Sequence, residues 1–181
     1  MALRRYRFGR RSGSRLLSLV VFLSLVVLVT SGGVLASVGK GTSPRIGFRA
    51  PVFTVKDLAG QEVSLAEQMG QPVFINFFAT WCTFCRVEMP YIQTLYEELG
   101  DEISFMIIDL RESKETVEAF FEAHKLTVPV YLDPTGTSGA RYGVRGIPAS
   151  YFIDTHGVIQ DMVIGAMSEE RLRQGLESIA P

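Results

Sequence analysis

The amino-acid sequence predicts an α/β fold, because apolar runs of strand length alternate with helical patterns along most of the chain. From residue 72 the order is strand, helix, strand, helix, strand, then two adjacent strands and a final helix. Residues 51–181 supply enough chain for one ordinary domain with its own hydrophobic core. A single α/β domain is therefore expected over this range.

Each expected element has a local signal. Residues 52–65 are expected to form an added N-terminal β-hairpin. Ser113 and Ser168 are expected helix caps, because each precedes a helical pattern and a serine side chain can accept from an unpaired amide of the first turn. The remaining strands are expected at residues 72–79, 103–108, 128–132, 149–153 and 158–164.

A helix is expected after the strand at 72–79, where apolar residues recur at helical spacing. The positions are Phe84, Val87, Tyr91, Leu95 and Leu99. Pro90 falls inside this helix, and because its ring removes a backbone hydrogen bond, a kink is expected there.

Both cysteines of the 181-residue chain lie in Trp81-Cys82-Thr83-Phe84-Cys85, at the junction of this strand and this helix. C-x-x-C spacing on adjacent helical turns allows a short disulfide or a shared metal ion. A structural zinc site needs four ligands, and the chain has only two histidines, His124 and His156, far apart in sequence. We therefore expect a redox-active pair, with no metal and no cofactor.

The two cysteines are expected to have different roles. Cys82 lies at the helix N-terminus, where unpaired amides and the helix dipole favour a thiolate, so it is the expected nucleophile. Cys85, one turn further in, is placed to attack a mixed disulfide at Cys82 and is the expected resolving thiol. The alternative is a permanent structural disulfide, but a bridge between residues i and i+3 closes a very small loop and constrains little unfolded chain.

Further motifs accompany the cysteine pair in a fixed order. They are Ala50-Pro51-Val52-Phe53, Asp57-Leu58-Ala59-Gly60, Asn76-Phe77-Phe78-Ala79-Thr80-Trp81-Cys82, Glu88-Met89-Pro90-Tyr91 and Gly146-Ile147-Pro148-Ala149-Ser150. On these motifs the chain, from about residue 50 to 179, resembles the thioredoxin superfamily, and more closely its extracytoplasmic TlpA/ResA branch of thiol-disulfide oxidoreductases. The resemblance implies a thioredoxin-like fold with a central mixed β-sheet flanked by helices. One departure is Phe84, where many relatives carry proline, and it bears on the redox potential rather than on the chemistry.

The resemblance also implies a substrate groove. It implies that Pro148 follows a cis peptide bond in a loop facing the cysteines, and that Ile147 pairs with an extended substrate segment. Trp81, beside Cys82, is implied to form an apolar rim that receives a substrate; the alternative for this side chain is simple packing.

Glu88 is a further candidate catalytic residue, because it lies three positions after Cys85 and so on the same face of the helix. Thioredoxin itself has a buried aspartate six residues before its first cysteine, and this chain has Asn76 there, which cannot take a proton. The resemblance associates a glutamate at position 88 with the active site. Partial burial would raise its pKa and suit it to acid–base work, whereas the alternative is a solvated glutamate that complements the helix dipole.

The N-terminal segment is expected to direct the domain across a membrane. Six arginines in residues 1–15 precede an uncharged, mostly apolar stretch at residues 16–38. That stretch is long enough for a transmembrane anchor, and a signal peptide cleaved after Ala36 is the alternative. Residues 1–15 would stay in the cytoplasm, residues 39–50 would form a linker, and residues 51–181 would face outward at the cell membrane or, after cleavage, be periplasmic or secreted.

Beyond residue 40 the chain has 11 basic against 19 acidic residues, which leaves a net charge of −8. This balance argues against nucleic acid as a partner. The acidic residues concentrate at 97–102 and 112–122, where helical patterns predict solvated faces rather than a ligand site.

The expected function is thiol-disulfide exchange with proteins as a reductant, for example of apocytochrome c cysteines before haem attachment. A membrane electron donor of the DsbD/CcdA kind would recharge the pair. Two alternatives stay open: a disulfide-donating oxidase, and a Cu(I)-handling module for respiratory oxidase assembly, to which Met89 could add a soft ligand. A peroxiredoxin is disfavoured, because the proline of its lone-cysteine motif would fall at Ile75.

Overall fold

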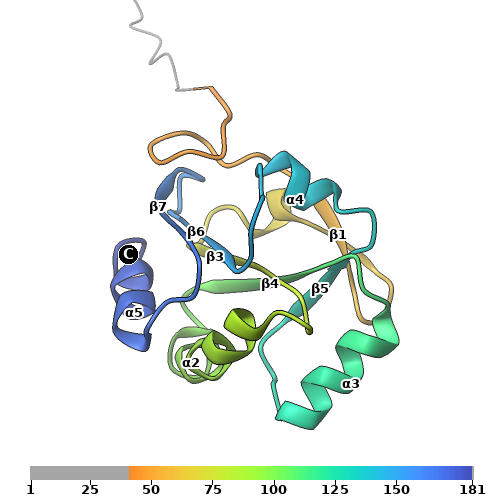
Figure 1. The fold of residues 1–181 in the computed structure, drawn as a ribbon. Coiled ribbons are helices and arrows are strands. Elements are labelled where there is room, and N and C mark those ends of the chain that lie inside the picture. Colours follow the sequence, from red (N-terminus) through yellow and green to blue (C-terminus); the bar gives the residue numbers. More distant parts are fainter. Residues whose placement is uncertain (1–40, 181) are drawn as a thin grey trace, which may run out of the picture. The chain divides into compact units, whose positions relative to one another are not determined.

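The computed structural model describes residues 41–180, and Figure 1 shows their fold. Its centre is a seven-stranded mixed sheet with strand order β2-β1-β5-β4-β3-β6-β7. The strands are β1 (Thr54–Asp57), β2 (Glu62–Ser64), β3 (Val73–Phe78), β4 (Ser104–Leu110), β5 (Val130–Asp133), β6 (Ala149–Ile153) and β7 (Ile159–Ile164). The helices are the 3₁₀ helix η1 (Leu65–Gln68), α2 (Thr83–Leu99), α3 (Lys114–His124), α4 (Thr137–Arg141) and α5 (Glu169–Glu177).

The expected cytoplasmic segment (1–15) and the expected anchor or signal segment (16–38) lie outside the described residues. Within residues 41–180, no helix combines the length and the apolar composition that a membrane crossing needs. The anchor therefore stays a prediction from sequence.

β3 lies inside the sheet, and all six of its residues are buried. It pairs in parallel with β4 and antiparallel with β6, while β4 pairs in parallel with β5. A strand that is covered on both sides needs a continuous apolar run rather than an alternating one. The strand expected at 72–79 and the mixed sheet are thus confirmed.

Helices cover both faces of this sheet (Figure 1). α2, α3 and α5 pack on one face, through a core that includes Met89, Phe121 and Leu172. η1 and the end of α4 pack on the other face, where Leu65 and Tyr142 are buried. α2, which carries the cysteine motif at its start, is therefore anchored along its length while its first turn lies just beyond the end of β3.

Most of the expected elements are present. β1 and β2 form the added antiparallel hairpin. Ser113 and Ser168 cap α3 and α5 by accepting from Thr116 N and Arg171 N, as their positions predict. The sequence pattern missed η1 and α4, because helices of four and five residues are too short to show a helical period.

The helix expected from the apolar pattern is confirmed as α2, but two apolar residues near its N-terminal end are exposed. Phe84 and Val87 are 67% and 56% exposed. The buried face of α2 is formed instead by Cys85, Glu88, Met89, Ile92, Gln93 and Leu95. Two large apolar side chains thus stand in solvent beside the cysteines, where they can contact another molecule.

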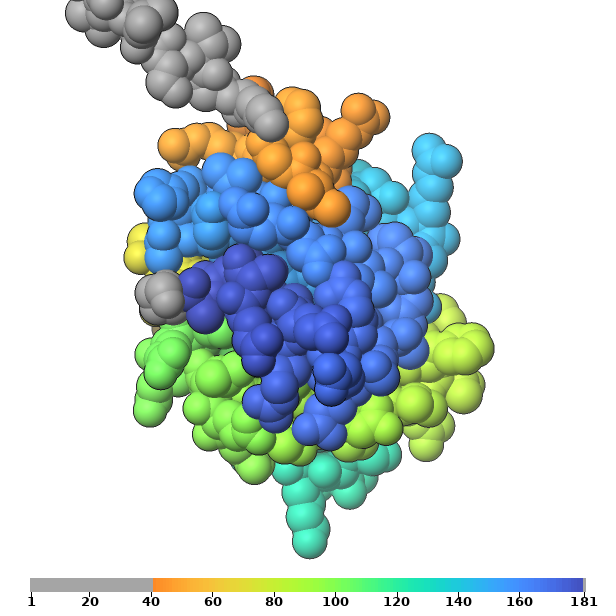
Figure 2. All heavy atoms as spheres, turned by 90° about the vertical axis from the view of Figure 1, so that its left-hand side faces the viewer, coloured from red at the N-terminus to blue at the C-terminus, as the bar shows by residue number. Residues whose placement is uncertain are grey.

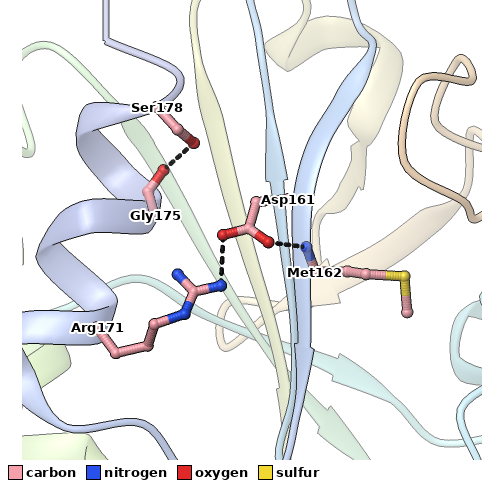
Figure 3. A network of polar contacts seen from close by, with 5 residues as sticks. All are labelled: Asp161, Met162, Arg171, Gly175 and Ser178. Carbon is pink, nitrogen blue, oxygen red and sulfur yellow. Dashed lines mark hydrogen bonds and ion pairs between the residues drawn. The ribbon is translucent and has the colours of Figure 1, made fainter.

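α5 is tied to the edge strand β7, and its dark blue spheres fill the centre of the face seen in Figure 2. Arg171 on α5 donates to Asp161 on β7 at 2.5 Å (Figure 3). Gly175 meets Phe152 so closely that a side chain at this position would overlap the ring, which explains why a residue without Cβ stands here. These contacts fix α5, and with it the loop 165–168 that reaches the active site.

Candidate active site

The two cysteines form a disulfide at the start of α2, with their Cα atoms 5.3 Å apart. Cys82 is the N-cap residue, and its Sγ accepts from the Cys85 amide at 3.2 Å. Cys82 is 6% exposed and Cys85 is 1% exposed. Access from solvent and the amide of the first turn therefore both favour Cys82 as the reactive sulfur, in line with the roles predicted from sequence.

A cis-proline loop faces the pair. The Ile147–Pro148 peptide bond is cis, which confirms this prediction. Cys82 Sγ lies 3.7 Å from the carbonyl oxygen of Ile147, and the loop is held from the other side by the Gly165 amide, which donates to Pro148 O at 2.8 Å. Among the described residues the amide of Ile147 has no acceptor, so it is free to pair with an incoming chain.

Glu88 is buried in the protein interior, at 1% exposure, on the side of α2 that carries Cys85. Its carboxylate accepts from Asn76 Nδ2 at 2.9 Å and from the Met167 amide at 2.8 Å. Burial raises its pKa from 4.5 to about 7, and the two hydrogen bonds only partly oppose this rise. The alternative of a solvated, first-turn glutamate is therefore wrong, and the side chain is more deeply buried than the half-burial expected.

Asn76 connects Glu88 to the sheet. Its Nδ2 donates to Glu88 on α2 and to Ser150 Oγ on β6, both at 2.9 Å, and it lies opposite Ser150 in the antiparallel pairing of β3 and β6. Its Oδ1 is buried without a partner among the described residues. At the position where thioredoxin has a buried aspartate, this chain thus has an amide, and the buried titratable carboxyl bound to it comes from the helix.

A second buried carboxylate site supports the turn before the cysteines. Glu112 accepts from the Thr80 amide at 2.5 Å and from Thr80 Oγ1 at 2.7 Å. Asp109, fully buried at the end of β4, accepts from the Glu112 amide at 3.0 Å. Burial, and next the neighbouring Glu112, raise the pKa of Asp109 to about 8.

This second site was not predicted from the sequence. The expectation that residues 112–122 form a solvated acidic face is wrong at Glu112, because its carboxylate is turned inward onto Thr80. An available signal was Asp109, a charged residue inside the apolar run of β4, where a carboxylate has to find partners or become neutral.

A groove of about 780 Å³ opens beside Cys82. Trp81 and Phe84 line it, and Trp81 is 70% exposed, so it is not packed in the core. Ile147 lines the same groove from the cis-proline loop. The structure thus brings together the residues predicted to bind substrate, although their role stays a prediction.

The other candidate ligands do not form a metal site with the cysteines among the described residues. His124 and His156 are exposed, and His124 Nδ1 bonds only to Phe120 O of its own helix. Met89, the extra soft ligand for copper, is 2% exposed within the core. Across residues 41–180, no three His, Cys, Asp or Glu side chains group closely enough to hold a metal ion.

The fold and the cysteine pair define the class: this is a thioredoxin-like thiol-disulfide oxidoreductase. A family model described as the AhpC/TSA family matches residues 46–162. The thiol-disulfide oxidoreductase ResA of Geobacillus thermodenitrificans is 38% identical over 143 residues, covering 77% of this chain and 81% of that protein. The chain belongs to the AhpC/TSA family and, within it, to the ResA-like thiol-disulfide oxidoreductases.

Solved structures agree with this assignment. StoA from Bacillus subtilis superimposes with a TM-score of 0.61 at 30% identity, covering 69% of this chain and 96% of that one. A secreted Mycobacterium tuberculosis disulfide oxidoreductase, homologous to E. coli DsbE, gives a TM-score of 0.65 at 26% identity over 70% of this chain and 95% of that one.

Proposed function

We propose that this chain is a membrane-anchored, extracytoplasmic reductase of protein disulfides. The observation that carries the proposal is the asymmetry of the cysteine pair. Cys82 lies against the cis-proline loop at the solvent side, while Cys85 shares the buried face of α2 with Glu88. A nucleophile at the edge of a groove, backed by a more deeply buried thiol and a proton acceptor, is the arrangement that two-step disulfide exchange requires.

In the first step the reduced protein meets a substrate disulfide. The thiolate of Cys82 attacks one substrate sulfur, a new S–S bond forms between them, and the other substrate sulfur leaves as a thiolate. The Cys85 amide, 3.2 Å from Cys82 Sγ in the disulfide form, is a donor that stabilises this thiolate. The free amide of Ile147 pairs with the substrate backbone next to the reacting sulfur.

In the second step Cys85 resolves the mixed disulfide. Its thiol gives its proton to the carboxylate of Glu88, and the resulting thiolate attacks Cys82 Sγ. The Cys82–Cys85 disulfide forms, and the second substrate sulfur leaves as a thiolate that takes up a proton. The substrate gains two electrons and the protein loses two. A pKa of about 7 suits Glu88 to this step, because it can hold and release a proton near neutral pH.

The substrates are proposed to be the cysteines of apocytochrome c, and the donor that restores the dithiol a membrane protein of the DsbD/CcdA kind. The relatives named thiol-disulfide oxidoreductase ResA support thiol-disulfide exchange, and the family resemblance of the sequence motifs suggests the reductive direction. Residues 1–15 are proposed to stay in the cytoplasm, 16–38 to anchor the chain, 39–50 to link, and 51–181 to face outward. The arginine-rich start, the apolar stretch and the secreted M. tuberculosis relative support this orientation.

A redox titration of the full-length chain with glutathione or dithiothreitol tests the direction of transfer. Trp81 is the only tryptophan of the chain and adjoins Cys82, so its fluorescence reports the state of the pair. A two-electron midpoint near or below about −230 mV supports a reductase, whereas one near about −150 mV means that the protein donates disulfides. The double variant Cys82→Ser/Cys85→Ser is the control and should show no redox-dependent signal.

A further inference from the structure

The groove beside Cys82 has a charge unlike that of the chain around it. Two arginines, Arg111 and Arg145, line it together with Trp81 and Phe84, and no acidic residue does. Beyond residue 40, acidic residues outnumber basic ones by 19 to 11. The charged residues that line the groove are therefore both positive, although the chain beyond residue 40 carries a net negative charge. This local positive charge attracts anionic groups to the groove.

Within residues 41–180, the guanidinium groups of these two arginines have no partner. In other parts of the fold Arg141 donates to Val52 O, and Arg171 donates to Asp161. Among the described residues, neither Arg111 nor Arg145 makes a side-chain hydrogen bond or an ion pair. All of their donors are available to a molecule in the groove.

The acidic residues nearest in sequence do not pair with the arginines of the groove. Glu112 follows Arg111 directly, but its carboxylate accepts two hydrogen bonds from Thr80 and forms no ion pair with either arginine among the described residues. Asp109 is fully buried, accepts from the Glu112 amide and does not line the groove. In the part of the chain that the structure describes, neither of these two acidic residues lines the groove or forms an ion pair with its arginines, so both guanidinium groups can bind an anion.

Arg111 is held in a costly position. Its φ of 72° lies in the left-handed region, which residues other than glycine rarely adopt. Its side chain lies across Gly136 so closely that a Cβ there would overlap the guanidinium group. Strained backbone of this kind clusters at functional sites, and here it directs a cation to the groove.

We propose that this groove selects protein segments that carry an acidic side chain close to the disulfide to be exchanged. The inference rests on the proposed function and adds the chemistry of the substrate. The substrate sulfur meets Cys82, its backbone pairs with Ile147, apolar side chains lie on Trp81 and Phe84, and a carboxylate binds Arg111 or Arg145. Arginine suits this task because its planar donors match a carboxylate.

The test uses the reduced full-length chain and three synthetic peptides, each closed by one disulfide. They differ only two residues before and after the first cysteine, where they carry Asp, Asn or Lys. We expect the second-order rate constant of peptide reduction to fall in the order Asp, Asn, Lys, with the Asp peptide about fivefold to tenfold faster than the Asn peptide, the range that one or two exposed ion pairs supply. In 1 M salt the preference should disappear, because the Debye length falls to about 3 Å.

Three variants assign the preference to the groove. Arg145→Glu and the double variant Arg111→Asn/Arg145→Glu should remove or invert the Asp-to-Asn ratio; asparagine is used at position 111 because it tolerates a positive φ. The control is Arg86→Glu, an exposed position on α2 that does not line the groove and makes no side-chain ion pair among the described residues. It makes the same charge change near the cysteines and should leave the ratio unchanged.

The outcomes separate this inference from the proposed function. If all three peptides are reduced at equal rates, or if Arg86→Glu alters the ratio as much as Arg145→Glu, the acidic-segment proposal is wrong and the reductase proposal stands. If no peptide is reduced, both fail. If reduced glutathione competes with the Asp peptide at micromolar concentration, the groove serves a small anionic thiol instead, and the proposal of a protein segment is overturned.

Discussion

The two sulfurs of the active site face two different environments. On the Cys82 side the surroundings are exposed: Trp81 and Phe84 stand in solvent, and arginines line a groove. On the Cys85 side they are buried and polar, with Glu88 bound to Asn76. The difference shows that the two sides of the motif suit two different tasks. Recognition of a substrate needs exposed side chains, whereas a carboxyl group with a pKa near 7 needs a buried site.

The largest effect on disulfide reduction should come from replacing each of the two cysteines in turn. Cys82→Ser removes the nucleophile and should lower disulfide reduction at least roughly a thousandfold. Cys85→Ser keeps the nucleophile and should instead accumulate a covalent complex with the substrate, because nothing resolves it. Non-reducing gel electrophoresis and mass spectrometry distinguish the two results, and trapping by Cys82→Ser rather than Cys85→Ser would reverse the assignment of roles.

The buried side should make stability depend on pH. The pKa of folded Glu88 is about 7 against 4.5 ordinarily, so the folded state binds a proton that the unfolded state lacks between these values. The stabilisation is therefore complete below pH 4.5 and is lost as the pH rises through 7, by up to about 3 kcal/mol. Asp109 acts in the same direction up to about pH 8.

Thermal unfolding of the oxidised chain from pH 4.5 to 8.5 measures this loss. Glu88→Gln should flatten the Glu88 part of the curve, because a neutral amide does not titrate and Asn76 can rotate to offer its unpaired Oδ1. Glu122→Gln, at an exposed position on α3, is the matched control and should leave the curve unchanged. An equal slope in wild type and Glu88→Gln would show that the carboxyl is not buried as described.

The turn before the cysteines should depend on Glu112. Glu112→Ala removes the acceptor of both Thr80 hydrogen bonds, and a partly buried, charge-assisted pair of this kind contributes about 2 kcal/mol. Denaturant unfolding should show a loss near this size, with slower exchange chemistry because Trp81 and Cys82 follow Thr80 directly. If Glu112→Ala is as stable as the wild type, the two hydrogen bonds to Thr80 do not stabilise this turn.

The smallest effect on stability should be on the exposed side. Phe84→Ala should change the free energy of unfolding by less than about 0.5 kcal/mol, because the side chain is already solvated. Phe74→Ala, the matched core position on β3, should cost about 3 to 5 kcal/mol. KM for a protein disulfide should nevertheless rise in Phe84→Ala, and an unchanged KM would remove Phe84 from the substrate surface.

The same division explains what the sequence could predict. Strands, helices and caps follow from local patterns, so the order of elements, Ser113 and Ser168 were predictable. Phe84 and Val87 belong to the pattern that predicted α2, but their exposure was not predictable, because an apolar residue at helical spacing is normally buried. Exposed apolar residues that are suited to bind another molecule do not follow the rule that apolar residues at helical spacing are buried.

The site residues that lie close together in sequence were predictable. Those that the pairing of the strands brings together were not. Cys82, Cys85 and Glu88 share one helix, so their spacing indicated a common face. Glu112 and Arg111 reach the active site only because β4 ends beside β3, and the register that brings them there is a property of the whole sheet. The cis bond before Pro148 came from family resemblance, since local sequence favours trans.

The pH dependence of the resolving step tests the central claim, that Glu88 takes the proton of Cys85. In stopped-flow mixing of the reduced chain with a peptide disulfide, the second phase of Trp81 fluorescence should speed up through about pH 7 as Glu88 ionises. In Glu88→Gln this phase should be about a hundredfold slower at pH 7, and its rise should move above pH 8, where a thiol ionises unaided. If Glu88→Gln keeps both the rate and the profile of the wild type, Glu88 is a structural residue and the division between the two sides of the site is wrong.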